Sequence, residues 1–176
     1  MTSYNRVQTS LSGDVAVAAD AYWRLLLEWD GILRWMRAEN RPIPLVEVKL
    51  KSGHRHGQVP CTRLCRVDTA ALPEGVAIPE VSAETLLHFD DEARMIYYCI
   101  EGEGPFGMRN YLAITEVDEL GPERSRITCR GRWELPEDIP VEPVRLAVQA
   151  IYESIIQDIA ATVAGRSPAF HAGQDR

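Results

Sequence analysis

Apolar residues recur at a helical period close to the C-terminus, between Pro143 and Ala164. One face of this stretch is apolar and consists of Val144, Val148, Ile151, Ile155, Ile159 and Thr162. The opposite face is polar and carries Arg145, Gln149, Glu153 and Gln157. Pro143 suits the first turn of a helix, and Gly165 suits the residue just beyond its end. The pattern predicts one amphipathic helix about 33 Å long, which needs a sheet to cover its apolar face.

The chain ahead of this helix begins with one strand and two short helices. Loose alternation of apolar and polar residues predicts a strand over Tyr4–Val17, with a possible bend at Gly13. Asp20 is a suitable N-cap for a helix over Ala21–Trp29, and Ile32–Met36 is typical of a second short helix.

Strand patterns then follow one another, with short turns between them. The predicted strands are Leu45–Lys51, Gln58–Val67, Val81–Phe89, Arg94–Glu101, Asn110–Leu120 and Arg124–Leu135. Short connections favour an antiparallel meander. We therefore predict an α+β fold, with a curved seven-stranded antiparallel sheet around a long C-terminal helix and two short helices after the first strand. We expect a single domain over residues 1–165 and a flexible tail over residues 166–176.

A sheet curved this far leaves an internal apolar cavity beside its helix, and that cavity is the expected functional site. The last strand shows which side chains face it. Ile127, Cys129, Gly131 and Trp133 share one face, which we expect to meet the helix. Arg126, Thr128, Arg130 and Arg132 alternate with them and should face solvent.

Composition narrows the class of protein. The chain has 176 residues and a formal net charge of −7, which argues against generic nucleic-acid binding because phosphate contacts need clustered Lys and Arg. Met1–Gln8 lacks the apolar core of a signal peptide, and no apolar run is long enough for a membrane-spanning helix. We therefore expect a cytoplasmic protein without integral membrane association, whose four cysteines are reduced thiols.

Several spaced motifs carry a family resemblance that covers about Leu11 to Ala164. They are the run from Val15 to Trp23, then Trp35, Gly57 with Arg63, Glu84-Thr-Leu86 with Asp90-Asp91, Arg94 and Tyr98, Pro105 with Tyr111-Leu-Ala113, and Trp133 before the long helix. Their order resembles the START-like, or birch-pollen-allergen-like, superfamily (SRPBCC), in particular its polyketide cyclase/dehydrase and lipid-transport branch. The chain departs from it at Cys61–Cys65, where cysteines flank Arg63 in place of the usual small and apolar residues.

The resemblance implies a helix-grip fold with a ligand pocket, in a family that includes lipid and hormone carriers and polyketide aromatase/cyclases. Fold alone does not choose among these functions. The candidate ligand-binding residues are Trp35, Tyr98, Tyr111, Trp133, Ile151 and Ile155. Tyr and Trp combine a flat apolar face with one hydrogen-bonding atom, as pocket walls do, although the same residues also build plain cores.

Two further sets of residues are candidates for chemistry. His88 is predicted to share a strand face with Leu86, Glu84 and Asp90. With Glu84, Asp90 or Asp91 it would allow acid–base catalysis, and the alternative is that it only ends a strand at the surface. Arg63 needs a carboxylate partner if it is buried, either Glu84 by default or an acidic group of a ligand. His54, His56, Cys61 and Cys65 offer nitrogen and sulfur ligands, but their spacing is not that of a zinc site. We expect no metal and no cofactor.

Three functional hypotheses follow. The first is binding or transport of a small hydrophobic ligand, by a monomer or a homodimer. The second is a cofactor-independent polyketide cyclase or dehydratase that uses the same cavity, which an inward-facing titratable pair at the cavity floor would favour. The third is an interaction module whose grip is filled by its own side chains, which a cavity smaller than roughly 300 Å³ would favour.

Overall fold

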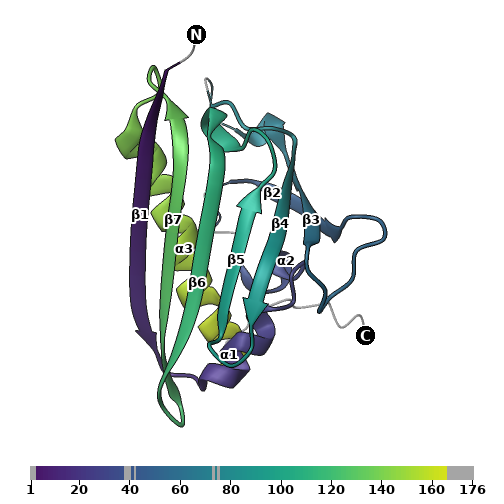
Figure 1. Ribbon diagram of the computed structural model, residues 1–176, viewed down its shortest axis with the longest axis vertical. Coiled ribbons are helices and arrows are strands. Elements are labelled where there is room, and N and C mark those ends of the chain that lie inside the picture. The colour runs from purple at the N-terminus through teal and green to yellow at the C-terminus, as the bar shows by residue number, and fades with distance from the viewer. Residues whose placement is uncertain (1–2, 38–40, 42, 73, 75, 166–176) are drawn as a thin grey trace, which may run out of the picture.

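A long helix lies across one face of a curved antiparallel sheet, which leaves the opposite face bare (Figure 1). The computed structural model describes residues 3–37, 41, 43–72, 74 and 76–165. The strands are β1 (Tyr4–Val15), β2 (Leu45–Leu50), β3 (Cys61–Val67), β4 (Val81–Asp90), β5 (Met95–Ile100), β6 (Arg109–Gly121) and β7 (Arg124–Pro136). The helices are α1 (Ala19–Leu26), α2 (Ile32–Trp35) and α3 (Val141–Val163), with short 3₁₀ turns η2 (Thr69–Ala71) and η3 (Pro105–Gly107).

The strands form one seven-stranded sheet in the order β1-β7-β6-β5-β4-β3-β2. β2 to β7 are sequential neighbours, so the predicted meander and the α+β class are confirmed. β1 pairs with β7, and the chain then crosses through α1 and α2 to begin β2 at the other edge. Register shifts in β2, β4 and β6 interrupt the ladders, and such bulges increase the local twist and bend of a strand.

Several predicted boundaries were wrong by a few residues. α1 follows Ala18 rather than Asp20, which lies in its first turn, and it ends at Leu26. β3 begins only at Cys61. β1 pairs with β7 without interruption from Tyr4 to Val15, so the bend suggested at Gly13 leaves no gap in the ladder. The predicted flexible tail lies outside the described residues.

The long helix matches its prediction, with a wider buried face. It begins at Val141, which keeps Pro143 within the first turn, where a missing N–H breaks no helical hydrogen bond. Gly165 follows it with φ +70°. The buried residues include the predicted Val144, Val148, Ile155 and Ile159, and also Tyr152, Ser154, Ile156, Asp158 and Ala160. The apolar stripe in the sequence predicted a narrower buried face than the one that α3 has in the structure.

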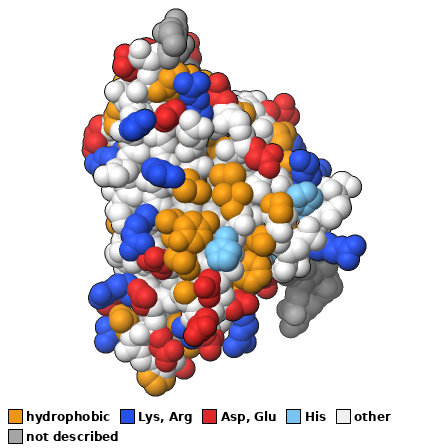
Figure 2. Space-filling model, in the orientation of Figure 1, with side chains coloured by type: hydrophobic (Ala, Val, Ile, Leu, Met, Phe, Trp, Pro, Cys, Tyr) orange, Lys and Arg blue, Asp and Glu red, His pale blue; other side chains and the backbone are white. Residues whose placement is uncertain are grey.

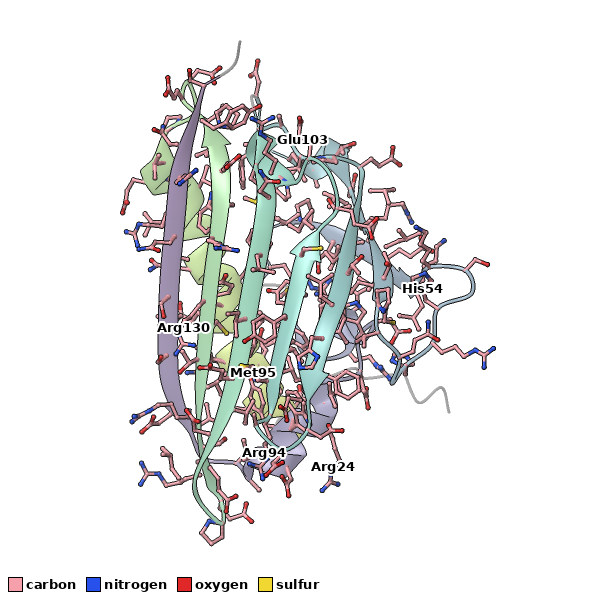
Figure 3. The ribbon with its side chains drawn as sticks, in the orientation of Figure 1. Arg24, His54, Arg94, Met95, Glu103 and Arg130 are labelled. Carbon is pink, nitrogen blue, oxygen red and sulfur yellow. The ribbon has the colours of Figure 1, made fainter. Side chains whose placement is uncertain are left out.

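The outer face of the sheet carries no helix. Hydrophobic side chains gather near its centre, and basic side chains, all of them arginines, lie along the β1 and β7 side (Figure 2). Arg126, Arg130 and Arg132 are exposed on β7, as predicted, whereas Thr128 is buried. Arg130 projects from β7, while His54 lies in the β2–β3 loop at the opposite edge (Figure 3). Within the described residues, no helix is both long and apolar enough to cross a membrane.

Candidate functional site

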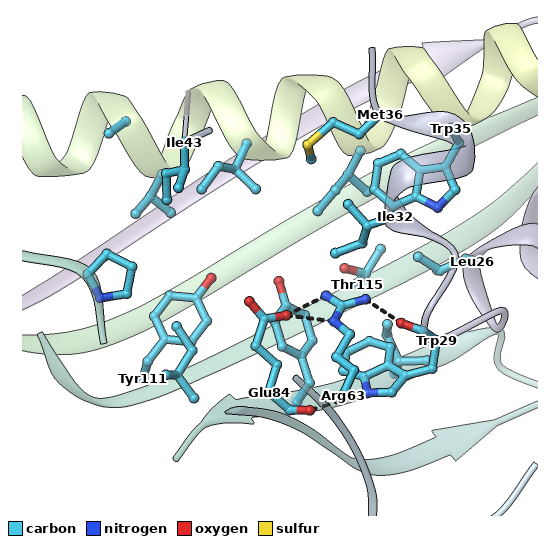
Figure 4. Close-up of a pocket in the computed structure, with 18 of the residues that line it drawn as sticks. Leu26, Trp29, Ile32, Trp35, Met36, Ile43, Arg63, Glu84, Tyr111 and Thr115 are labelled. Atoms are coloured by element: carbon cyan, nitrogen blue, oxygen red, sulfur yellow. Dashed lines mark hydrogen bonds and ion pairs between the residues drawn. The ribbon is translucent and has the colours of Figure 1, made fainter. Parts of the chain in front are cut away.

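An internal cavity of about 100 Å³ lies between α3, α2 and the middle strands of the sheet (Figure 4). Its apolar wall includes Trp29, Trp35, Met36, Ile96, Met108 and Ile155. A second chamber of about 80 Å³ adjoins it toward β2 and β3. Six residues line both chambers: Ile32, Met36, Ile43, Glu84, Pro105 and Ile151. These six residues form the partition between the chambers.

The cavity also has a polar floor, built around Arg63. This side chain projects from β3, and its guanidinium binds one carboxylate oxygen of Glu84 on β4 through Nε at 2.8 Å and Nη2 at 2.5 Å. Nη1 donates to the backbone carbonyl of Trp29 at 2.7 Å (Figure 4). The guanidinium carbon also lies 3.8 Å from the centroid of the Trp29 ring. One arginine thus links two strands to the segment between α1 and α2.

The charge of Arg63 is stabilised where it lies. Burial is the largest single influence and would by itself lower the pKa of this guanidinium. The attraction and hydrogen bond of Glu84, together with Cys65 and Tyr98, more than offset burial, and the pKa is raised. The residue is only 8% exposed, and a buried cation at this depth requires such partners. The predicted default, a structural ion pair with Glu84, is present. Because the Glu84 side chain lines both chambers, the pair is also within reach of anything bound there.

Three tyrosine rings continue the polar floor toward α3. Tyr98 and Tyr111 project from β5 and β6, and their ring centroids lie 6.1 Å apart. The hydroxyl of Tyr111 is 3.1 Å from the hydroxyl of Tyr152 on α3. Burial raises the pKa of each of these phenols above its ordinary value. All three hydroxyls therefore stay protonated, and hence able to donate, at neutral pH.

Most of the residues predicted to bind a ligand lie at this cavity. Trp35, Tyr98, Tyr111, Ile151 and Ile155 line it. Trp133 does not; it is buried behind Tyr111, with ring centroids 6.1 Å apart, and belongs to the packed core. The sequence analysis missed Trp29, because it was assigned to the last turn of a helix, and Met36, which ended the second predicted helix.

The predicted pairing of His88 with Glu84 was wrong. A bulge in β4 shifts the register between Leu86 and His88, so that Leu86 pairs with Tyr98 but His88 pairs with Tyr97. His88 is therefore turned to the outer face, where it is exposed and its ring lies 6.0 Å from that of Tyr97. Strict alternation had placed it inside, and a single extra residue reverses the face.

The histidines and cysteines near the β2–β3 loop have separate partners. Nδ1 of His54 accepts a hydrogen bond from the Thr62 backbone, while Nε2 of His56 lies 3.1 Å from a carboxylate oxygen of Asp30. The Cys61 thiol donates to a backbone carbonyl, and burial raises the pKa of Cys65 to about 12. Among the described residues, no three His, Cys, Asp or Glu side chains are grouped to hold a metal. All four cysteines are free thiols.

The sequence profile of a family described as "Polyketide cyclase / dehydrase and lipid transport" matches residues 6–164. The chain belongs to this family. The match covers β1 from Arg6 onward, all of β2 to β7 and α3, and it includes every residue of the cavity and its polar floor. No curated protein matches the sequence.

Solved structures similar to this family member share its fold. A norcoclaurine synthase from Thalictrum flavum superposes with a TM-score of 0.68 at 16% identity, covering 94% of this chain and 99% of that one. The Zhui aromatase/cyclase from Streptomyces sp. R1128 gives 0.67 at 18%, covering 92% and 96%. An uncharacterised protein from Bacillus thuringiensis gives 0.66 at 21%, covering 90% and 99%. At these identities the likeness establishes the helix-grip fold alone. The family match over residues 6–164 confirms the predicted superfamily.

Proposed function

We propose that this protein binds a small, largely apolar molecule in the internal cavity, with one polar group of the ligand directed toward Arg63, Glu84 and the tyrosines. The observation that carries the proposal is the polar floor at the base of an otherwise apolar cavity. Burial of apolar ligand surface would supply the affinity, at about 25 cal/mol per Å². The few polar groups would set the orientation of the ligand.

The volume of the cavity limits the size of the ligand. At about 100 Å³ the cavity is below the roughly 300 Å³ typical of drug-sized pockets, which favours the hypothesis of a self-filled grip. A dry cavity of about 150 Å³ is nonetheless enough for benzene. The adjoining chamber of about 80 Å³ becomes available if Met36 and Ile151 change rotamer. A ligand built on one aromatic ring is therefore the best match.

A second candidate function is a cofactor-independent cyclase or dehydratase. The observation that favours it is the inward-facing Arg63–Glu84 pair beside two protonated phenols, which is the kind of titratable floor expected for an enzyme. Tyr98 or Tyr111 would donate a hydrogen bond to a carbonyl oxygen of the substrate, while Glu84 would accept a proton. The likeness to the Zhui aromatase/cyclase is consistent with this alternative.

Native mass spectrometry of the purified protein, followed by extraction, tests the proposal. We expect a bound small molecule on the wild-type chain. Ile151→Phe should remove it, because the larger ring fills the partition between the two chambers. Leu146→Phe is the matched control, since Leu146 lies on the same helix but is 52% exposed.

The outcome separates the hypotheses. Retention in the wild type and in Leu146→Phe, with loss in Ile151→Phe, supports binding in the cavity. If the wild type retains nothing and takes up none of a panel of single-ring aromatic ketones and phenols, the interior is self-filled and the proposal fails. Conversion of a panel member to a new product would instead establish the enzyme.

A further inference from the structure

Tyr152 reaches from α3 to the sheet through a space that only glycine leaves open. The hydroxyl oxygen of Tyr152 lies 2.0 Å from the position that a Cβ atom on Gly131 would occupy. Any other residue at position 131 would collide with it. The ring is 1% exposed, so this phenol is part of the interior although it does not line the cavity. Gly131 and Tyr152 together place a hydroxyl group directly behind the cavity wall.

The Tyr152 hydroxyl has one hydrogen-bond partner among the described residues, the hydroxyl of Tyr111 at 3.1 Å. Two hydroxyls joined by one hydrogen bond hold two hydrogen atoms, of which one lies between the oxygens. If Tyr111 donated, the hydrogen of Tyr152 would be left unpaired in a packed apolar region, which is unfavourable. If Tyr152 donates, the hydrogen of Tyr111 is left for the neighbouring Tyr98 hydroxyl or for a ligand, since Tyr98 and Tyr111 both line the cavity. Donation from Tyr152 to Tyr111 therefore leaves no hydroxyl hydrogen without a partner in the packed core.

A comparison with Tyr22 shows that this arrangement is specific. Tyr22 is also fully buried, but its hydroxyl donates to the backbone carbonyl of Ile155 at 2.7 Å and is thereby satisfied within the core. The Tyr152 hydroxyl is instead directed at a cavity-lining hydroxyl. The raised pKa values of Tyr111 and Tyr152 are consistent with both groups keeping their hydrogens.

We propose that Tyr152 is a positioning residue, which donates to Tyr111 and so orients the Tyr111 hydroxyl as a hydrogen-bond donor into the cavity. The site then selects ligands that present a hydrogen-bond acceptor at this point, and a ketone or aldehyde carbonyl attached to an aromatic ring fits both the donor and the size of the cavity. This inference rests on the proposed function, and it names the ligand class for the same cavity.

The test uses two probes of nearly the same shape, acetophenone and α-methylstyrene, which differ by a carbonyl oxygen in place of a methylene group. Calorimetric titration measures the affinity of each probe. We expect the wild type to prefer acetophenone by roughly tenfold, the upper range for one net hydrogen bond. Tyr111→Phe should abolish the preference, and Tyr152→Phe should reduce it to about threefold or less.

Infrared spectroscopy of bound acetophenone supplies a readout that a purely structural role would not change. A donor from Tyr111 lowers the carbonyl stretching frequency, so the frequency should rise in Tyr152→Phe while the probe stays bound. Tyr22→Phe is the matched control, because it also removes a buried, hydrogen-bonded phenol hydroxyl, but one that does not line the cavity and is bonded to a backbone carbonyl instead of to Tyr111. It should keep both the preference and the frequency of the wild type.

Two results would overturn the inference. If Tyr152→Phe keeps the wild-type preference and carbonyl frequency while Tyr111→Phe loses them, Tyr111 acts without Tyr152, although the cavity still binds ligand. If the wild type binds the two probes equally well, no donor in the cavity selects the carbonyl, and the inference fails although the cavity still binds ligand. If neither probe binds the wild type, the proposed function fails together with the inference for this ligand class.

Discussion

Arg63 shows how a single side chain can serve both stability and function. Its guanidinium joins β3 to β4 through Glu84 and to the α1–α2 connection through the carbonyl of Trp29. Removing one partner of such a pair leaves an uncompensated charge in the interior, which typically costs about 3–5 kcal/mol. The same pair forms the floor of the cavity. Substitutions of Arg63 would therefore mix folding and binding effects, which is why the binding tests rely on other residues.

The buried thiols make the stability of this protein sensitive to alkaline pH. Burial raises the pKa of Cys129 and of Cys65 to about 12, whereas a thiol in the unfolded chain ionises near its ordinary value. Between these values the unfolded state has lost a proton that the folded state keeps. The free energy of unfolding therefore falls as pH rises, by up to about 1.4 kcal/mol per pH unit for each thiol, and is level below about pH 8.

Cys129→Ala tests this prediction in urea titrations between pH 7 and pH 10. We expect the decline between pH 9 and pH 10 to become shallower by about 1 kcal/mol. Ile127→Val is the control, because Ile127 is buried on the same face of β7 and the change destabilises the core without removing an ionisable group. An equal slope in wild type and Cys129→Ala would contradict the prediction.

At the scale of elements, the packing of α3 on β1 depends on a close approach at Gly13. A Cβ atom there would lie 2.9 Å from Cγ2 of Ile156 on α3. Because that methyl is attached directly to the Ile156 Cβ, it has little freedom to move aside, and the helix itself must shift. The glycine suspected of bending the strand is thus needed for helix contact.

Gly13→Ala should therefore destabilise the protein by about 1–3 kcal/mol, the usual cost of overpacking. Ser10→Ala on the same strand is the control, because Ser10 is exposed and its substitution should change stability by less than about 0.5 kcal/mol. Equilibrium unfolding in urea measures both. Equal stabilities of the two variants would show that α3 tolerates a wider separation from β1.

At the scale of the whole molecule, the interior consists of two small chambers rather than one large pocket. Met36 is 6% exposed and lines both. A methionine partition is adaptable, since its three torsions allow it to fold back against either wall. In the proposed function, the size of the ligand would be limited by this side chain as much as by the curvature of the sheet.

Met36→Ala should join the chambers, at a cost in stability of about 2–5 kcal/mol. Affinity for 2-acetonaphthone, which has two fused rings, should rise relative to acetophenone by about tenfold or more. Met95→Ala on β5 is the control, because Met95 does not line the cavity. The measurement is calorimetric titration of both ketones. An unchanged ratio in Met36→Ala would show that Met36 does not control the passage between the chambers.

The sequence by itself determined the elements, their order and the family. Hydrophobic periodicity depends only on neighbouring residues, and the order and spacing of the motifs are visible in a single sequence. The long helix, the meander and most of the cavity-lining aromatics could be predicted on that basis. The bulge in β4 could not, since register depends on how two strands pair, and it turns His88 away from the face of Glu84, with which strict alternation would have grouped it.

Only the tertiary structure decided what the interior contains. The convergence of Arg63 with the carbonyl of Trp29, and of Tyr152 with Tyr111, joins residues far apart in the chain. The volume of the cavity is likewise a small difference between large packed volumes, to which no local pattern is sensitive. Periodicity predicts which side chains face inward. The distances between those side chains, the directions of their hydrogen bonds and the volume of the cavity are set only when the sheet packs against α3.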